Sequence, residues 1–270
     1  MGNLAGSSAR TKDAPLAERL NMGKMTGRLR LIAKDGDLDK ILNQSASDLK
    51  NLRALDLSEC GLKSLPSAIG TSLVKLQVLK LSDNPDLASL PVELAGLKEL
   101  RKLDCSNCSK LQSLETIPKC VEELELSGCN FQGLVEHPLL PLSAHLTKLD
   151  LSNNPGITGF GPAFGFEILS NSLTELNMDN TAVQDVPESI GNLKSLSVLR
   201  LENTRVSSLP RSLLADTPVA RLELKGTRMT KESFLSLSGA DAFMQRRKAR
   251  IDREIAGGIT SPDTSVCGLD

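Results

Sequence analysis

Residues 52–66 read LRALDLSECGLKSLP, and residues 76–91 read LQVLKLSDNPDLASLP. Both segments place Leu at their first, fourth and sixth positions, and Cys60 or Asn84 follows three residues after the last of these. The central L-x-L alternates as a strand does when one face is buried. One such strand cannot bury its own leucines, so we expect neighbouring copies to stack and form the core between them.

The same pattern recurs along most of the chain. Six further copies begin at Leu100, Val121, Leu146, Leu173, Leu196 and Val219, so that successive starts lie 24, 24, 21, 25, 27, 23 and 23 residues apart. A degenerate copy, GRLRLIAKDGDLDKI at residues 27–41, is expected to cap the N-terminal end. Self-similarity at this period is typical of solenoids.

These copies match the leucine-rich repeat pattern L-x-x-L-x-L-x-x-N/C-x-L. The return segments carry Leu-Pro or Val-Pro followed by SAIG, VELAGL, ESIGNL or RSLL, which resembles the intracellular, Ras-group type of leucine-rich repeat protein. The resemblance covers residues 27–230. It implies an α/β leucine-rich repeat solenoid (horseshoe) with a concave parallel sheet, about eight repeats, an N-terminal cap and a C-terminal capping helix.

The overall plan is similar to the family of leucine-rich repeat-containing protein 57. It has an MGN start, a short leader, the repeats, and a helix that contains FMQR and ends in basic residues. The resemblance to that family implies no catalytic activity for this chain. The resemblance implies an intracellular interaction protein with an N-myristoylated Gly2.

Four segments follow from the pattern. Residues 1–26 are expected to be a flexible basic leader, 27–230 the repeat domain, 231–256 a capping helix, and 257–270 a disordered tail rich in Gly, Ser and Thr.

The predicted capping helix places Phe243, Arg247, Ile251 and Ile255 at helical spacing. Two interpretations, contact with a membrane or nucleic acid and the solvated face of a capping helix, fit its basic residues Arg246, Arg247, Lys248, Arg250 and Arg253. Asp252 and Glu254 interrupt the basic run and favour the capping helix.

Composition excludes several classes of protein. The chain has 270 residues and a net charge of −1, so no global field attracts nucleic acid. It lacks Trp and Tyr, the usual stacking platforms for single-stranded nucleic acid. The sequence shows no signal peptide and no long apolar run, and we expect a cytoplasmic protein with reduced thiols.

The N-terminus suggests a lipid tether. Gly2 follows the initiator Met, but the sixth position is Gly6 where the myristoylation motif has Ser or Thr. Residues 1–34 hold seven Lys or Arg against Asp13 and Glu18, and this excess would add to the weak membrane affinity of one acyl chain. The alternative is a flexible basic leader that has no role in membrane binding.

Cys105 and Cys108 form a C-x-x-C pair, the spacing of many zinc and dithiol sites. The repeat gives another interpretation: Cys105 occupies a core leucine position, and Cys108 occupies the column that bonds the backbone after each strand. That column is Cys60, Asn84, Cys108, Cys129, Asn154, Thr181, Thr204 and Thr227. His137 and His145 have no Cys or His at ligand spacing. We therefore predict no metal, no cofactor and no catalytic residue.

A protein partner is expected on the concave face. Its central column is Asp56, Lys80, Asp104, Glu125, Asp150, Asn177, Arg200 and Glu223. Five of these eight residues are acidic, which favours a basic partner segment. The alternative is that the outward side of a solvated sheet simply requires polar residues.

Two functions fit this pattern. The first is a monomeric, non-catalytic scaffold or adaptor for protein–protein interaction in intracellular signalling, with peripheral membrane contact through the N-terminus. The second is a regulatory or targeting subunit of an enzyme such as a phosphatase or ubiquitin ligase.

Overall fold

The computed structural model describes residues 14–36, 38, 40–41, 48–112, 114, 117–135, 144–161, 164–259 and 265–269. The chain divides into two compact units, Met1–Cys129 and Asn130–Asp270, and each is described by itself. Within the described residues, no helix combines the length and apolar character needed to cross a bilayer.

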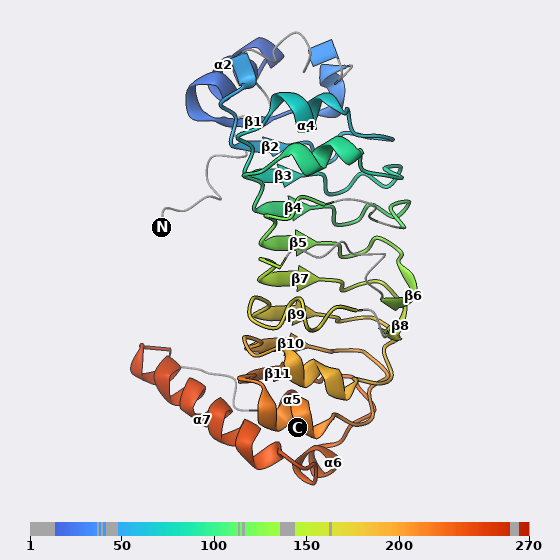
Figure 1. The fold of residues 1–270 in the computed structure, drawn as a ribbon, viewed down its shortest axis with the longest axis vertical. Coiled ribbons are helices and arrows are strands. Elements are labelled where there is room, and N and C mark those ends of the chain that lie inside the picture. Colours follow the sequence, from blue (N-terminus) through green and yellow to red (C-terminus); the bar gives the residue numbers. More distant parts are fainter. Residues whose placement is uncertain are drawn as a thin grey trace. The chain divides into compact units, whose positions relative to one another are not determined.

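The first unit is a stack of short parallel strands (Figure 1). The register aligns one leucine per strand, for example Leu55 with Leu79 and Leu79 with Leu103. Helical turns return the chain between strands. In chain order the elements are α2 (Leu16–Thr26), β1 (Arg28–Arg30), η1 (Ala33–Asp35), β2 (Ala54–Asp56), α4 (Ala68–Ser72), β3 (Val78–Lys80), η2 (Val92–Gly96), β4 (Lys102–Asp104) and β5 (Glu123–Glu125).

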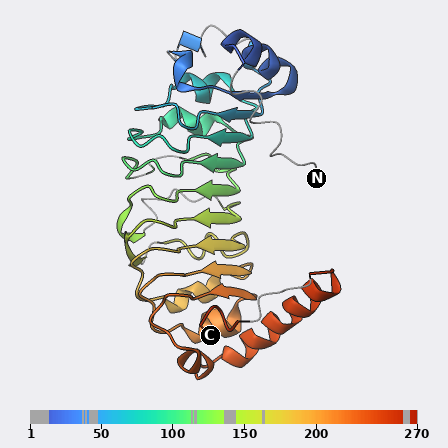
Figure 2. The same cartoon turned by 180° about the vertical axis from the view of Figure 1, so that it is seen from behind.

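The second unit repeats this plan with strands in the order β7-β9-β10-β11, and adds the parallel pair β6 and β8. Its elements are β6 (Gln132–Val135), β7 (Lys148–Asp150), β8 (Gly156–Phe160), β9 (Glu175–Asn177), η4 (Glu188–Asn192), β10 (Val198–Arg200), α5 (Arg211–Asp216), β11 (Arg221–Glu223), α6 (Lys231–Leu235) and α7 (Ala240–Ala256). Figures 1 and 2 show α7 running beside α5.

The leucines of L-x-L form the core of each unit. Leu55, Leu79, Leu103 and Leu199 are no more than 1% exposed. A small residue is required where successive return segments touch. A Cβ atom on Gly70 would lie 2.1 Å from the carbonyl oxygen of Glu93, which leaves no room for a side chain. The fold is therefore the α/β leucine-rich repeat solenoid expected from the sequence.

The N-terminal segment differs from the expected flexible leader. Residues 16–26 form α2, in which Arg19 and Gly23 are buried. The Arg19 guanidinium pairs with the Asp35 carboxylate and donates to the Arg30 carbonyl oxygen at 2.8 Å. The helix is therefore fixed to the edge of β1. Gly2 and the rest of residues 1–13 lie outside the described residues.

The C-terminal segment also differs from expectation. The predicted helix over 231–256 is two helices, α6 and α7, separated at Gly239, which has a φ of +94°. Ile255 is 53% exposed and does not join the buried side of α7. The tail was expected to be disordered, but residues 265–269 pack against β11 and Cys267 is only 4% exposed. The prediction of disorder is wrong for these five residues.

Candidate partner-binding surface

In the first unit, the central column lies on the side of the strands opposite the buried leucines. Lys80 is exposed, and Asp56 and Glu125 are half-buried. Asp104 is only 8% exposed, which corrects the expectation that it faces a partner. Alternation along a strand sets which face a residue is on, but neighbouring side chains decide how much of it solvent reaches.

The aspartates of the column have a local structural role. Oδ1 of Asp56, Asp104 and Asp150 accepts a hydrogen bond from the backbone N–H two residues later, at 3.0, 3.0 and 2.8 Å. Oδ1 of Asn177 accepts from Asp179 N at 3.0 Å in the same way. These bonds close the turn that leaves each strand. The recurring D-x-S spacing was the sequence signal for this role, and the column interpretation overlooked it.

Ion pairs neutralise part of the remaining acidity in the first unit. Arg30 lies 3.4 Å from Asp56, and Lys102 lies 3.2 Å from Glu123 and also pairs with Glu125. Burial alone would lower the pKa of Lys102, but its hydrogen bonds to the two glutamates and their charges raise that pKa overall. This part of the face therefore carries mixed charge rather than a net acidic surface.

In the second unit, Arg221 pairs with Glu223 at 2.6 Å, and Asn177 donates to Asp150 at 3.2 Å. Asp179 lies two residues after the central-column residue Asn177, close enough to Glu202, Glu223 and Arg200 for their charges to act on it. Burial raises the pKa of Asp179 to about 6, and the charges of Glu202 and Glu223 add to this rise, whereas the Glu202 backbone N–H and Arg200 oppose it. The central column predicted from the sequence does not include Asp179.

This pKa gives a testable prediction for Asp179→Asn. Between about pH 4 and 6 the folded protein retains a proton that the unfolded chain has lost, so Asp179 lowers stability as pH rises through this window. We expect the variant to be about 1 kcal/mol more stable at pH 7, a value reduced for solvent screening of a half-buried group, and unchanged at pH 4. Urea unfolding at both pH values measures this. Asp185→Asn, at an exposed site, is the control. An equal gain at both pH values would contradict the prediction.

A further column lies one residue before the backbone-bonding column in each repeat, and the sequence analysis did not predict it. It has positive φ in every repeat and comprises Glu59, Asp83, Asn107, Gly128, Asn153, Asn180, Asn203 and Gly226. Several of its side chains bond one another, as in Asn180 to Asn153 at 2.9 Å and Asn203 to Asn180 at 2.8 Å. Asn, Asp and Gly are the residues that best tolerate this conformation, so their recurrence was the available signal.

The backbone-bonding column confirms the structural interpretation of the cysteines. Cys105 and Cys108 are fully buried, and the Cys108 thiol donates to the Leu81 carbonyl oxygen at 3.2 Å. Burial raises the pKa of Cys105 well above its usual value and that of Cys108 to about 11. Among the described residues, no three His, Cys, Asp or Glu side chains form a metal-binding group. His145 is exposed, and His137 lies outside the described residues.

The thiols should therefore resist alkylation while the protein is folded. We expect Cys105, Cys108 and Cys129 to react with iodoacetamide at least about 10³-fold more slowly in buffer than in denaturant, because a buried thiol with a raised pKa must first be exposed by unfolding. Peptide mapping by mass spectrometry gives the rate for each site, with the half-buried Cys120 as internal reference. Native labelling of Cys105 or Cys108 as fast as that of Cys120 would contradict this expectation.

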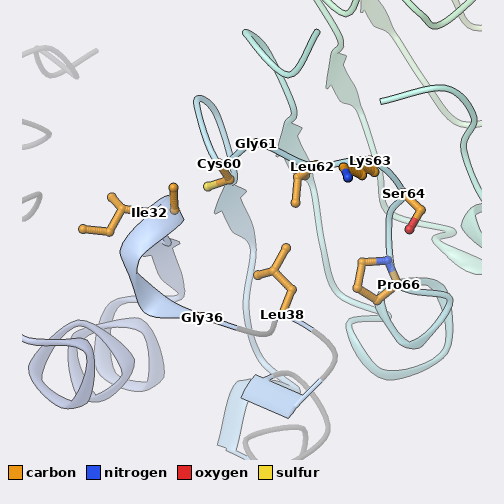
Figure 3. A pocket seen from close by; sticks show the side chains of 10 residues that line it. Ile32, Gly36, Leu38, Cys60, Gly61, Leu62, Lys63, Ser64 and Pro66 are labelled. Carbon is orange, nitrogen blue, oxygen red and sulfur yellow. The ribbon is translucent and has the colours of Figure 1, made fainter. Parts of the chain in front are cut away.

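A cavity of about 220 Å³ lies in the first unit, between η1 and the turn that follows β2. In Figure 3, Leu38 and Leu62 point toward each other across it, with the Cys60 thiol nearby. Burial raises the pKa of Cys60 to about 11, and its Sγ lies 3.3 Å from the Leu31 carbonyl oxygen. The thiol is thus a structural donor to the backbone rather than a reactive group.

Comparisons with known proteins agree with this architecture. Two family models described as leucine rich repeat match residues 40–109 and 142–161. A probable disease resistance protein of Arabidopsis thaliana is 29% identical over 167 residues, which is 54% of this chain and 9% of the relative. The probable serine/threonine-protein kinase pats1 of Dictyostelium discoideum is 30% identical over 156 residues, which is 55% of this chain and 5% of the relative. The chain thus spans less than a tenth of the length of these two relatives.

Two solved structures share the fold. Internalin C2 of Listeria monocytogenes superimposes with a TM-score of 0.53 at 20% identity, covering 72% of this chain and 80% of the internalin. Human 5T4 superimposes with a TM-score of 0.55 at 21% identity, covering 77% and 80%. The family matches and these structures establish that the chain contains leucine-rich repeats.

Proposed function

We propose that this leucine-rich repeat chain is a non-catalytic scaffold that binds a protein partner through the open face of its strands. The observation that carries the proposal is the stack of short parallel strands, which buries its leucines and leaves a polar row of mixed charge on the other face. Solenoids use such extended faces to hold partners. We further propose that the scaffold acts in intracellular signalling.

We infer that the residues most suitable for a basic partner segment lie in the second unit. Asp56 and Asp104 accept hydrogen bonds that close their own turns, and Asp56 also pairs with Arg30. Glu202, Glu223 and Asp179 lie close enough for their charges to interact, with Arg221 paired to Glu223. A cationic partner group would relieve that repulsion and bring the pKa of Asp179 back toward its usual value. Charge complementarity of this kind governs specificity and association rate.

The test is affinity purification followed by quantitative mass spectrometry. We expect Glu202→Lys combined with Glu223→Lys to lower recovery of the specific partner at least about 10-fold, the loss expected when two attractive contacts become repulsive. The matched control is Asp185→Lys combined with Asp216→Lys, which reverses two exposed charges in the same unit away from the strand face. Equal recovery with both double variants would place the partner site elsewhere. A catalytic subunit recovered in stoichiometric amount would instead favour the regulatory-subunit alternative.

We also propose N-myristoylation at Gly2, supported by the MGN start. The basic residues that would assist it are fewer than the sequence count suggests. Arg19 pairs with Asp35, Lys24 with Asp48 and Arg30 with Asp56. We therefore expect weak, reversible membrane binding rather than stable anchoring. Membrane fractionation of wild type and Gly2→Ala tests this, and an identical distribution of the two would refute the tether.

A further inference from the structure

The outer edge of β11 bonds to a segment that is not a strand. In each repeat of the second unit, the residue after the central column donates its N–H to the central-column carbonyl of the next repeat. Examples are Met178 to Arg200 and Leu201 to Glu223, both at 2.9 Å. The equivalent donor after β11 is Leu224, and it donates to the Cys267 carbonyl oxygen at 2.8 Å. Cys267 therefore takes the place of the central residue of a further repeat.

The other end of the same edge is closed by a side chain. The Thr174 carbonyl oxygen accepts from the backbone N–H groups of Ser197 and Val198 in the next repeat. The equivalent carbonyl before β11 is that of Ala220, and it accepts from Nε of Arg250 in α7 at 3.1 Å. Between these two contacts, the N–H and C=O of Leu222 point away from β10, because those of Arg221 and Glu223 point toward it.

Residues 265–269, here called the clasp, form a compact turn. Cys267 N donates to the Ser265 carbonyl oxygen at 2.9 Å, and Leu269 N donates to that of Val266 at 3.0 Å. The Arg247 guanidinium, itself 7% exposed, donates to the Ser265 carbonyl oxygen and ties the clasp to α7. The clasp thus makes hydrogen bonds within itself, and the bond from Leu224 N to the Cys267 carbonyl oxygen joins it to the strand edge.

We propose that the clasp is a displaceable cap that prevents the chain from self-associating through the outer edge of β11. An uncovered strand edge is a template for pairing with another strand. A second copy presents the same edge, so two β11 strands can pair across a two-fold axis in a closed dimer. The clasp occupies the Leu224 donor that this pairing requires. With the clasp seated the chain is a monomer, and with it displaced the dimer forms.

The test compares the full chain with a chain that lacks residues 265–270. Sedimentation velocity between about 1 and 100 µM should show a monomer throughout for the full chain and a concentration-dependent dimer for the truncated chain. In dilute solution, hydrogen exchange of the Leu224 amide should be at least about 10-fold faster in the truncated chain. A truncated chain that stays monomeric at the highest concentration, or unchanged protection of Leu224, overturns the proposal.

A point variant guards against misfolding of the truncated chain. Gly268 has a φ of +76°, and a Cβ atom there would lie 3.0 Å from Cβ of Lys225, so Gly268→Val should unseat the clasp without shortening the chain. Gly61→Val is the matched control, because Gly61 has a φ of +66° and open space around its Cβ position. Circular dichroism verifies folding. We expect dimer formation by Gly268→Val alone. Dimers of both variants, or of neither, overturn the proposal.

Discussion

Asn84→Ala should lower the free energy of unfolding by about 4 kcal/mol, because it leaves buried backbone groups of two repeats without partners. The Asn84 amide nitrogen donates to the carbonyl oxygens of Leu57 at 3.0 Å and Leu81 at 2.7 Å. Its Oδ1 accepts from Cys60 N at 3.1 Å and Leu62 N at 3.0 Å. Alanine makes none of these bonds. Urea-induced unfolding followed by circular dichroism measures the loss.

Thr204→Ala is the control for this prediction. Thr204 occupies the same column, but its hydroxyl donates to the Leu201 carbonyl oxygen of its own repeat, at 2.7 Å. Its loss should cost about 1 kcal/mol. If Asn84→Ala cost no more than Thr204→Ala, the bonds that Asn84 makes to the preceding repeat would contribute nothing to stability.

Arg19→Met should cost about 3–5 kcal/mol at pH 7, since it leaves the Asp35 carboxylate buried without its cation. The two side chains are 4% and 5% exposed. Arg19 also donates to the carbonyl oxygens of Ala14 and Arg30 at 2.9 and 2.8 Å, so the variant releases α2 from β1 as well. Lys24→Met is the matched control on the same helix, because its partner Asp48 is exposed and such pairs contribute less than about 1 kcal/mol.

The cost of Arg19→Met should depend on pH. Burial alone would raise the pKa of Asp35, but the hydrogen bond from Arg19, the Ile32 N–H and the Arg19 charge lower it overall. In wild type the pair therefore stabilises the fold above the ordinary aspartate pKa, and this contribution is lost as pH falls through the lowered value. In the variant, burial acts without Arg19 and favours the protonated acid. The deficit measured at pH 7 should thus shrink at pH 4, and a constant deficit would contradict this account.

The strands and the core could be predicted from the sequence because their signal is local and repeated. L-x-L fixes which residues are buried, and the repeat length fixes which strands are neighbours. The same register predicts that Cys105 and Cys108 are structural residues, and both are buried.

The bonds that fix the terminal caps could not be predicted, because they are made by arginine side chains in addition to apolar residues such as Phe243 and Ile251. In residues 16–26 the side chain that fixes the helix is Arg19, whose partner Asp35 lies 16 residues away. In α7, Arg246 and Arg250 donate to backbone carbonyl oxygens at the start of β11 rather than to solvent. From sequence alone, these cations resemble the solvated face of a helix.

The chemistry of the central column could not be predicted from the sequence. The pattern placed the central column on the open face, and the structure agrees for Lys80, which is exposed. It could not show that Asp104 bonds its own turn or that burial and two neighbouring glutamates act on Asp179. Those properties depend on distances between side chains of different repeats.

The arginine of each cap bonds to backbone at or next to one terminal strand, which bears on how repeats can be added within a unit. Arg19 binds the carbonyl of Arg30, and Arg250 binds that of Ala220, so neither cap contacts an inner strand through these bonds. Between β2 and β4 every connection recurs in register, including the leucine alignment. A duplicated copy of residues 76–99 inserted after residue 99 would meet the same neighbours on both sides. The number of repeats in the first unit can therefore change by whole repeats while the cap on β1 stays in place.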